Sequence, residues 1–185
     1  MTMHLQAQGS PIVLRMAQES DLDAYLAFLH DEETGRLTGS QQTFTRDQIE
    51  AWLRKIGTPS EERVDLLIVL EETGELLGEV VLNEMDAANR SANIRIAIQG
   101  TQHRGRGFGT EAMRLMLRHG FDALGLHRIH LGVYAFNPRA IHVYEKLGFK
   151  REGVQRDVLY QDGAYHDLIL MAILEDEFRA LYGEA

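Results

Sequence analysis

The sequence predicts an α+β fold with a mixed central sheet flanked by helices. Two observations carry this prediction. Amphipathic segments with the 3.6-residue period of a helix recur along the chain. Between them lie short segments rich in branched aliphatic residues and bounded by turn residues, which is typical of strands. The order in which these segments follow one another is that of an α+β protein.

The N-terminal part is predicted to contain one strand and two helices. Ile12–Arg15 is predicted to be the first strand. The Ser20 and Asp23 pair starts a helix whose apolar face carries Leu22, Tyr25, Leu26 and Leu29. The capping box of Thr45 and Gln48 starts a second helix, with Ile49, Trp52, Leu53 and Ile56 on its apolar face. The polar residues 31–44 between them are predicted to be a loop.

The remaining elements are expected in the following order. Strands are predicted over residues 65–70, 76–84 and 92–98, and a helix over 110–124. A strand over 129–134 and a helix over 139–147 follow, the helix being ended by Gly148. A hairpin formed by residues 154–160 and 165–173, and a helix over 175–182, complete the chain.

Bulk properties narrow the class of protein. The 185 residues suffice for a single domain, which we expect over residues 10–185, with 1–9 as a disordered tail. The formal net charge of −9 argues against nucleic-acid binding and favours cationic partners, or reflects solubility alone. The chain has no cysteine, no apolar leader and no apolar run that could span a bilayer. We therefore expect a cytoplasmic protein without membrane partners.

A glycine-rich segment is the most informative local feature of the chain. It runs from Arg104 to Thr110, with glycines at 105, 107 and 109, and leads directly into an amphipathic helix. Glycine lets the backbone approach a ligand closely. Free N–H groups at a helix start attract phosphate, and the positive charge of His103, Arg104 and Arg106 adds to that attraction in an otherwise acidic chain. The segment predicts a phosphate-binding site; the alternative is an ordinary turn before a helix.

The spacing of this loop selects among phosphate-binding motifs. No Gly-Lys-Ser/Thr ends the segment, so it is not a P-loop. A dinucleotide fingerprint requires a third glycine where Thr110 stands. The pattern Arg104-x-x-Gly107-x-Gly109 instead resembles the Arg/Gln-x-x-Gly-x-Gly/Ala loop of the GCN5-related N-acetyltransferases, the GNAT superfamily, whose loop amides hold the pyrophosphate of coenzyme A.

A second segment strengthens this resemblance. Residues 137–149, Asn-Pro-Arg-Ala-Ile-His-Val-Tyr-Glu-Lys-Leu-Gly-Phe, are similar to the second GNAT signature. The resemblance extends from about Ile12 to Leu174 and is greatest to the ribosomal-protein alanine acetyltransferases and the spermidine N-acetyltransferases. It implies that two parallel strands, 92–98 and 129–134, splay apart in a mostly antiparallel sheet and admit the pantetheine arm between them.

The resemblance also implies a cofactor site for acetyl-CoA. The loop would contact pyrophosphate, the backbone of one strand would pair with pantetheine as an added strand, and one N–H of that strand would polarise the thioester carbonyl. The residues so assigned are Ile96, Ala97, Ile98, Arg104, Gly105, Arg106, Gly107, Phe108, Gly109, Thr110, Asn137, Arg139 and Tyr144.

Two catalytic residues are predicted. Tyr144 matches the family's general acid, because a phenol is protonated at neutral pH and can donate to a leaving thiolate; without the resemblance it is an ordinary core tyrosine. Glu84 ends a strand expected to face the acceptor, and it is the candidate general base, although a water chain can replace a base. Weaker candidates are Asp86, His166 and Asp167. No spacing of the histidines predicts a metal site.

The predicted function is acetyl transfer from acetyl-CoA to a primary amine, by direct transfer in a ternary complex. A polyamine and the N-terminal amine of a protein or peptide are equally tenable acceptors, and another small amine is a third. An alternative from a different class is a coenzyme A sensor without turnover. A homodimer formed through the C-terminal hairpin is a further expectation.

Overall fold

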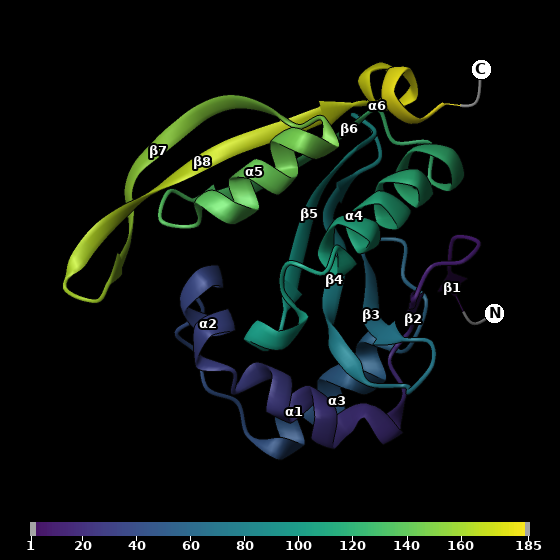
Figure 1. Ribbon diagram of the computed structural model, residues 1–185, viewed down its shortest axis with the longest axis vertical. Coiled ribbons are helices and arrows are strands. Elements are labelled where there is room, and N and C mark those ends of the chain that lie inside the picture. The colour runs from purple at the N-terminus through teal and green to yellow at the C-terminus, as the bar shows by residue number, and fades with distance from the viewer. Residues whose placement is uncertain (1–2, 184–185) are drawn as a thin grey trace.

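A single sheet organises the molecule. The computed structural model describes residues 3–183, and its eight strands lie in the order β1-β2-β3-β4-β5-β6-β8-β7 (Figure 1). The strands are β1 His4–Leu5, β2 Ile12–Arg15, β3 Val64–Leu70, β4 Leu76–Asp86, β5 Ser91–Ile98, β6 Arg128–Tyr134, β7 Lys150–Gln161 and β8 Ala164–Leu174. Together with the helices this gives the α+β architecture with a mixed sheet that the sequence predicts.

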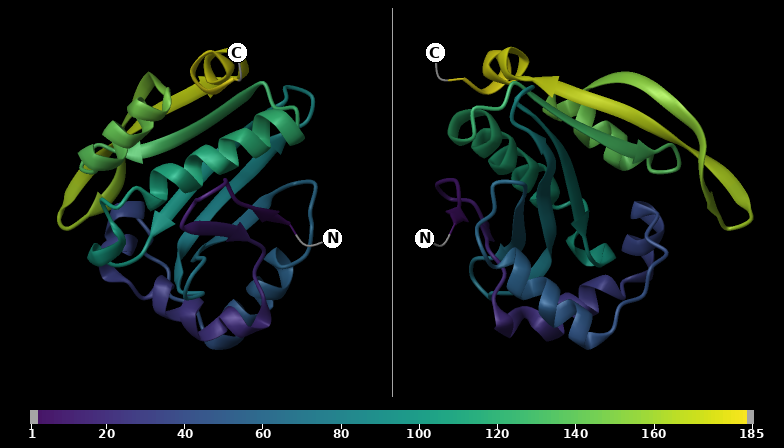
Figure 2. Two further views of the ribbon diagram at one scale, coloured as in Figure 1. Left: turned by 45° about the vertical axis from the view of Figure 1, so that its right-hand side comes forward. Right: turned by 180° about the vertical axis from the view of Figure 1, so that it is seen from behind.

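Helices cover both faces of the sheet (Figure 2). They are α1 Leu22–Leu29, α2 Glu32–Thr38, α3 Arg46–Ile56, α4 Phe108–Arg118, α5 Pro138–Leu147 and α6 Glu175–Tyr182. Short 3₁₀ turns form at Glu19–Asp21 and Thr101–His103. In the residues that the structure describes, no helix has the length and apolar character to span a membrane.

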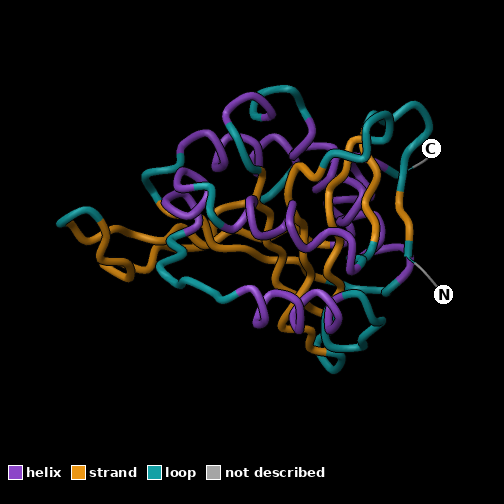
Figure 3. Tube along the Cα trace, turned by 90° about the horizontal axis from the view of Figure 1, so that it is seen from below, coloured by secondary structure: helices purple, strands orange, loops and turns teal. Residues whose placement is uncertain are grey.

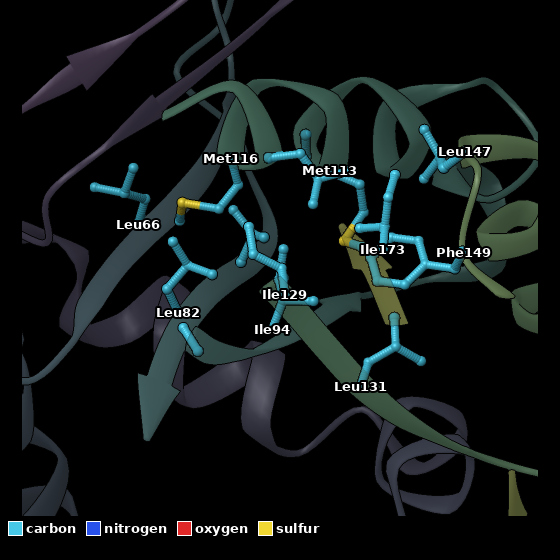
Figure 4. Close-up of a cluster of buried hydrophobic side chains, with 14 of the residues drawn as sticks. Leu66, Leu82, Ile94, Met113, Met116, Ile129, Leu131, Leu147, Phe149 and Ile173 are labelled. Carbon is cyan, nitrogen blue, oxygen red and sulfur yellow. The ribbon is translucent and has the colours of Figure 1, made fainter. Parts of the chain in front are cut away.

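The two faces of the sheet bury separate apolar clusters. On one face, α4, α5 and α6 pack against the sheet, and Met113 and Met116 of α4 are completely buried there against Ile94 and Ile129 (Figure 4). On the other face, α1 and α3 cover β3 and the start of β4 through Tyr25, Phe28, Ile49, Leu53 and Ile56. Burial of these apolar side chains fixes which face of each helix points at the sheet.

The one parallel pair in the described sheet is β5 with β6, and it separates along its length. Residue pairs form only at Ser91↔Arg128, Ala92↔Ile129 and Asn93↔His130. Beyond Asn93, β5 continues to pair with β4 on its other side as far as Gly78↔Ile98. The backbone from Ile94 to Ile98 therefore has no partner from β6, which confirms the predicted splay.

The structure differs from the predicted elements in three places. The expected loop at 31–44 contains α2, which Asp31 caps and which Gly39 ends in a left-handed conformation with φ of 67°. Its seven residues include only one large apolar side chain, so periodicity did not reveal it. The helix predicted over 110–124 begins at Phe108 and changes to a π-helical turn at His119–Ala123.

The third difference concerns the N-terminus. In the segment expected to be a disordered tail, His4–Leu5 forms β1, because it pairs with Leu14 and Arg15 of β2. Residues 1–2 lie outside the described part. At the other end of the sheet, the β7–β8 hairpin extends well away from the body of the molecule (Figures 1 and 3).

Candidate active site

A cleft of about 870 Å³ lies on the face of the sheet covered by α1, α2 and α3. Its floor is formed by β4, β5 and β6, and it reaches Tyr144 and Asn137 on α5 and its cap. We call it the main cleft. Aromatic side chains contribute much of its wall; they are Tyr25, Phe28, Phe44, Trp52 and Tyr134. The part of β5 that has no partner from β6, residues 94–98, is called the unpaired part of β5. Because it lines this cleft, a ligand lying between β5 and β6 would be accessible from the cleft.

The glycine loop has the geometry of a phosphate site. Gly105 and Gly107 have φ values of 78° and 88°, which favour glycine over any residue with a Cβ. Gly107 is the N-cap of α4, so the first N–H groups of that helix have no partner within it. A Cβ on Gly107 would meet nothing within 4 Å. The loop therefore offers an open surface of N–H donors at a positive helix end.

The two signature segments meet in space. A Cβ built on Gly105 would lie 2.8 Å from Nη2 of Arg139, which is in the first turn of α5. The Arg106 guanidinium lies over the Phe108 ring, 4.8 Å from its centroid. Two guanidinium groups thus flank the loop, and with the unpaired backbone of Ile96 and its neighbours the residues present fit a diphosphate with an extended arm, as coenzyme A has.

Two groups that are predicted to contact the cofactor form hydrogen bonds or ion pairs within the protein. The Arg104 guanidinium is turned away from the loop surface: it is 12% exposed and pairs with Asp31. The Ile98 carbonyl accepts from Arg104 Nη2 at 3.1 Å and from Thr34 Oγ1 at 3.2 Å. The side chain of Arg104 and the carbonyl of Ile98 are therefore not free for the cofactor here, and their assignment stays a prediction.

Asn137 and Tyr144 are both positioned by α5, Asn137 as its N-cap and Tyr144 within the helix. Oδ1 of Asn137 accepts from the backbone N–H of Ala140 at 3.2 Å, so Asn137 caps α5 and fixes where that helix begins. Tyr144, seven residues further, lines the main cleft, and its ring lies 5.9 Å from the Phe149 ring. Burial raises the pKa of Tyr144 to about 12. Its phenol is therefore protonated at neutral pH, as a proton donor must be.

Glu84 does not line the main cleft. It is exposed, has a φ of 51° where the β4–β5 register shifts, and borders a second hollow with Lys55, Asp65 and Met85. This corrects the orientation expected from the end of a predicted strand, because the irregular register turns the chain there. Its role as a base stays a prediction. Asp86, His166 and Asp167 are likewise absent from the residues lining the main cleft.

The carboxylate in the main cleft is Glu79, which sequence reasoning missed. Its side chain is 15% exposed, and its Oε2 accepts a 2.7 Å hydrogen bond from Tyr25. Trp52 Nε1 donates to the same tyrosine hydroxyl at 3.3 Å. Burial raises the pKa of Glu79 above its ordinary value. The signal for this residue was a charge between the apolar residues Leu76–Leu77 and Val80–Leu82.

The charged side chains that line the main cleft include more cations than anions. Among its lining residues, three carry formal charge: Arg63, Glu79 and Arg95. Arg63 forms a bidentate pair with Asp65, at 2.6 and 2.7 Å. Arg95 approaches Oε1 of Glu79 to 3.8 Å, which is beyond hydrogen-bond distance. The acidity of the whole chain is thus not concentrated in this cleft. Within residues 3–183 there is also no group of three or more side chains suited to a metal ion.

Comparisons with known proteins agree with this geometry. The family model described as an acetyltransferase (GNAT) domain matches residues 12–150. Spermidine N(1)-acetyltransferase of Vibrio cholerae is 31% identical over 174 residues, covering 92% of this chain and 96% of that protein. A putative ribosomal N-acetyltransferase of Bacillus subtilis is 31% identical over 139 residues, covering 75% of this chain and 73% of that protein.

A solved structure shows the same fold. The spermidine N-acetyltransferase of Vibrio cholerae in complex with CoA and spermine superposes with a TM-score of 0.83 at 27% identity, over 92% of this chain and 99% of that one. The fold, the two signature segments and the family match therefore agree. The chain belongs to the GNAT acetyltransferase family and is an acetyl-CoA-dependent N-acetyltransferase.

Proposed function

We propose that the acceptor is a small primary amine that enters the main cleft and reacts by direct transfer in a ternary complex. The observation that carries the proposal is that Tyr144 and Glu79 line one cleft along the unpaired part of β5. Acetyl-CoA supplies the thioester to this cleft. Tyr144 gives its hydroxyl proton to the sulfur as the C–S bond breaks. An N–H of β5 polarises the carbonyl.

Glu79 receives the proton that the amine loses as the C–N bond forms, directly or through one water. Its raised pKa suits this role, because a base works best when its pKa approaches the operating pH. The comparison of Glu79→Gln with Glu84→Gln tests the assignment. We expect Glu79→Gln to lower kcat/KM by roughly 10²-fold or more and to remove the acidic limb of its pH profile. A larger loss of kcat/KM in Glu84→Gln than in Glu79→Gln would assign the role of the base to Glu84.

Polyamines are the first acceptors to test, because the Vibrio cholerae relative is a spermidine N(1)-acetyltransferase whose structure holds CoA and spermine. The aromatic wall of the main cleft fits the methylene chain and the ammonium groups of such a ligand. Glu79 offers a carboxylate to these ammonium groups.

A peptide N-terminus is the second candidate, and Arg95 favours it. The Arg95 side chain is 56% exposed in the main cleft and lies beyond hydrogen-bond distance of Glu79. Its guanidinium would repel a polycation, whereas it would bind the carbonyl oxygens that follow a peptide amine.

A thiol-release assay with acetyl-CoA separates these acceptors. The chain has no cysteine, so it adds no background. Spermidine and spermine are compared with short peptides that have free N-termini. Each acceptor is tested with the wild type and with Arg95→Gln. Faster turnover of spermidine by the wild type supports the polyamine. Turnover of peptides alone, weakened by Arg95→Gln, supports the second candidate. No turnover of either, with acetyl-CoA bound, would contradict both.

We also propose a homodimer formed through the β7–β8 hairpin. Val154, Val158, Tyr160 and Tyr165 are each about half exposed or more on this hairpin, which is a large apolar surface for an isolated chain. Light scattering on the purified protein tests this. A dimer that Val158→Lys converts to a monomer is expected, and a monomeric wild type at micromolar concentration would contradict it.

A further inference from the structure

Arg104 connects the phosphate-binding loop to the wall of the main cleft. Its Nη2 donates to Thr34 Oγ1 at 2.9 Å and to the Ile98 carbonyl at 3.1 Å. It also pairs with the carboxylates of Asp31, at 3.4 Å, and Glu33. All these partners lie outside the loop, at the start of α2 and the end of β5.

The α2 end of this connection is itself well fixed. Oδ2 of Asp31 accepts from the N–H of Thr34 at 2.9 Å and so caps α2. Thr34 is buried, and its hydroxyl also lies 3.2 Å from the Ile98 carbonyl. Thr34 and Thr38 both line the main cleft, so the position of α2 sets the shape of the cleft wall.

A phosphate would have to displace these partners to reach the Arg104 side chain. Two carboxylates already neutralise its charge, and the side chain is nearly buried. Arg106 is different: it is exposed, and it stacks on Phe108 at the start of α4. The two arginines of the loop therefore have separate tasks, with Arg106 available to the ligand and Arg104 bound to α2.

We propose that Arg104 is a positioning residue that couples acetyl-CoA binding to the order of the acceptor cleft. When the amides that follow Arg104 hold the diphosphate, the backbone of the loop is fixed. Arg104 passes this constraint to Thr34, Asp31 and Glu33, and α2 becomes less mobile. The acceptor then meets a cleft wall that has already lost conformational freedom.

Hydrogen exchange of the amides in residues 31–39 tests the proposal without any acceptor, so it is independent of the proposed function. The probe is acetyl-CoA, and its affinity is measured by calorimetry for each variant. Thr34→Val removes the hydroxyl that accepts from Arg104 and donates to Asp31, and it keeps the shape, the charge and the N–H that Asp31 caps. Thr38→Val is the matched control, because its hydroxyl donates within α2 to the Thr34 carbonyl at 2.8 Å and not to Arg104.

Acetyl-CoA is expected to slow exchange in α2 of the wild type and of Thr38→Val by several-fold. Thr34→Val is expected to bind acetyl-CoA with a Kd within about threefold of the wild type and to lose part of this slowing, because the pairs of Arg104 with Asp31 and Glu33 remain. Slowing as large in Thr34→Val as in the wild type, or none in the wild type, would overturn the proposal. Absence of acetyl-CoA binding by the wild type would instead contradict the family's activity itself.

Arg104→Gln distinguishes a connector from a phosphate ligand. If Arg104 is a connector, Arg104→Gln should lose the slowing of exchange in α2. It should also raise the acceptor KM more than it lowers kcat, and Thr34→Val should show the same larger effect on KM. A phosphate ligand would show a weakened acetyl-CoA affinity in Arg104→Gln alone, comparable to that of Arg106→Gln, with Thr34→Val unaffected in every readout. That pattern would refute the connection.

Discussion

The hydroxyl of Tyr25 donates a 2.7 Å hydrogen bond to Oε2 of Glu79 and thereby joins α1 to β4. Trp52 of α3 donates to the same hydroxyl. A buried carboxylate is costly unless its oxygens are hydrogen-bonded, so this chain of donors is what allows Glu79 to lie on the cleft floor. The same bonds hold α1 and α3 against the sheet.

The stability of the protein should depend on the protonation of Glu79. Burial raises the pKa of Glu79 above its ordinary value of 4.5, so the folded state binds this proton more tightly than the unfolded state does. The stabilisation is complete below that value and is lost as pH rises through the folded pKa. Glu79→Gln cannot titrate. We expect the unfolding free energy of the variant, relative to the wild type, to increase from about pH 4.5 upward in urea titrations. A pH-independent difference would contradict this.

Tyr25→Phe should destabilise the fold. The substitution removes the donor to Glu79 and the acceptor for Trp52 while the ring stays packed in the α1 cluster. We expect a loss of about 1–3 kcal/mol, the cost of leaving a buried polar group unpaired. Denaturant unfolding measures it. Thr58→Val is the control, because it removes an exposed hydroxyl that donates to the Arg54 carbonyl at 3.1 Å and should show no measurable change. Equal values for the two variants would count against the role of the bond.

Tyr144→Phe should separate chemistry from binding. Phenylalanine keeps the ring contact with Phe149 but cannot donate a proton. We expect kcat to fall by roughly 10²- to 10⁴-fold, with the Kd for acetyl-CoA unchanged. Tyr182→Phe, which removes a 3.2 Å bond to the Leu147 carbonyl at the far end of α5, should keep its rate. A Tyr144→Phe enzyme with full activity would exclude the tyrosine as the acid.

Gly107→Ala should weaken acetyl-CoA binding beyond its effect on stability. Gly107 and Gly163 both have left-handed φ values, 88° and 78°, and a Cβ on either would meet nothing within 4 Å. Alanine at each position should therefore cost a similar 1–2 kcal/mol or so in backbone strain. Only Gly107→Ala should also raise the Kd for acetyl-CoA, because Gly163 lies in the distant β7–β8 turn. Calorimetry and thermal unfolding of both variants provide the comparison.

Much of the fold followed from local patterns. The strands β2 to β6 and helices α3, α5 and α6 lie within a few residues of their predicted positions. The capping box of Thr45 starts α3 and the left-handed Gly148 ends α5, both through contacts a few residues apart, so the sequence reveals them. α2 and β1 escaped prediction because they are short and are stabilised by distant partners, Arg104 and β2 respectively.

The sequence by itself determined the glycine loop, the helix that carries Tyr144 and the succession of most strands along the chain, since each depends on residues that are neighbours along the chain. Only the tertiary structure decided which carboxylate enters the main cleft and where Arg104 points. Glu79 reaches Tyr25 across 54 residues, and Arg104 reaches Thr34 across 70. Such pairs form only after the sheet has packed against its helices, because burial and register place their partners within hydrogen-bond distance.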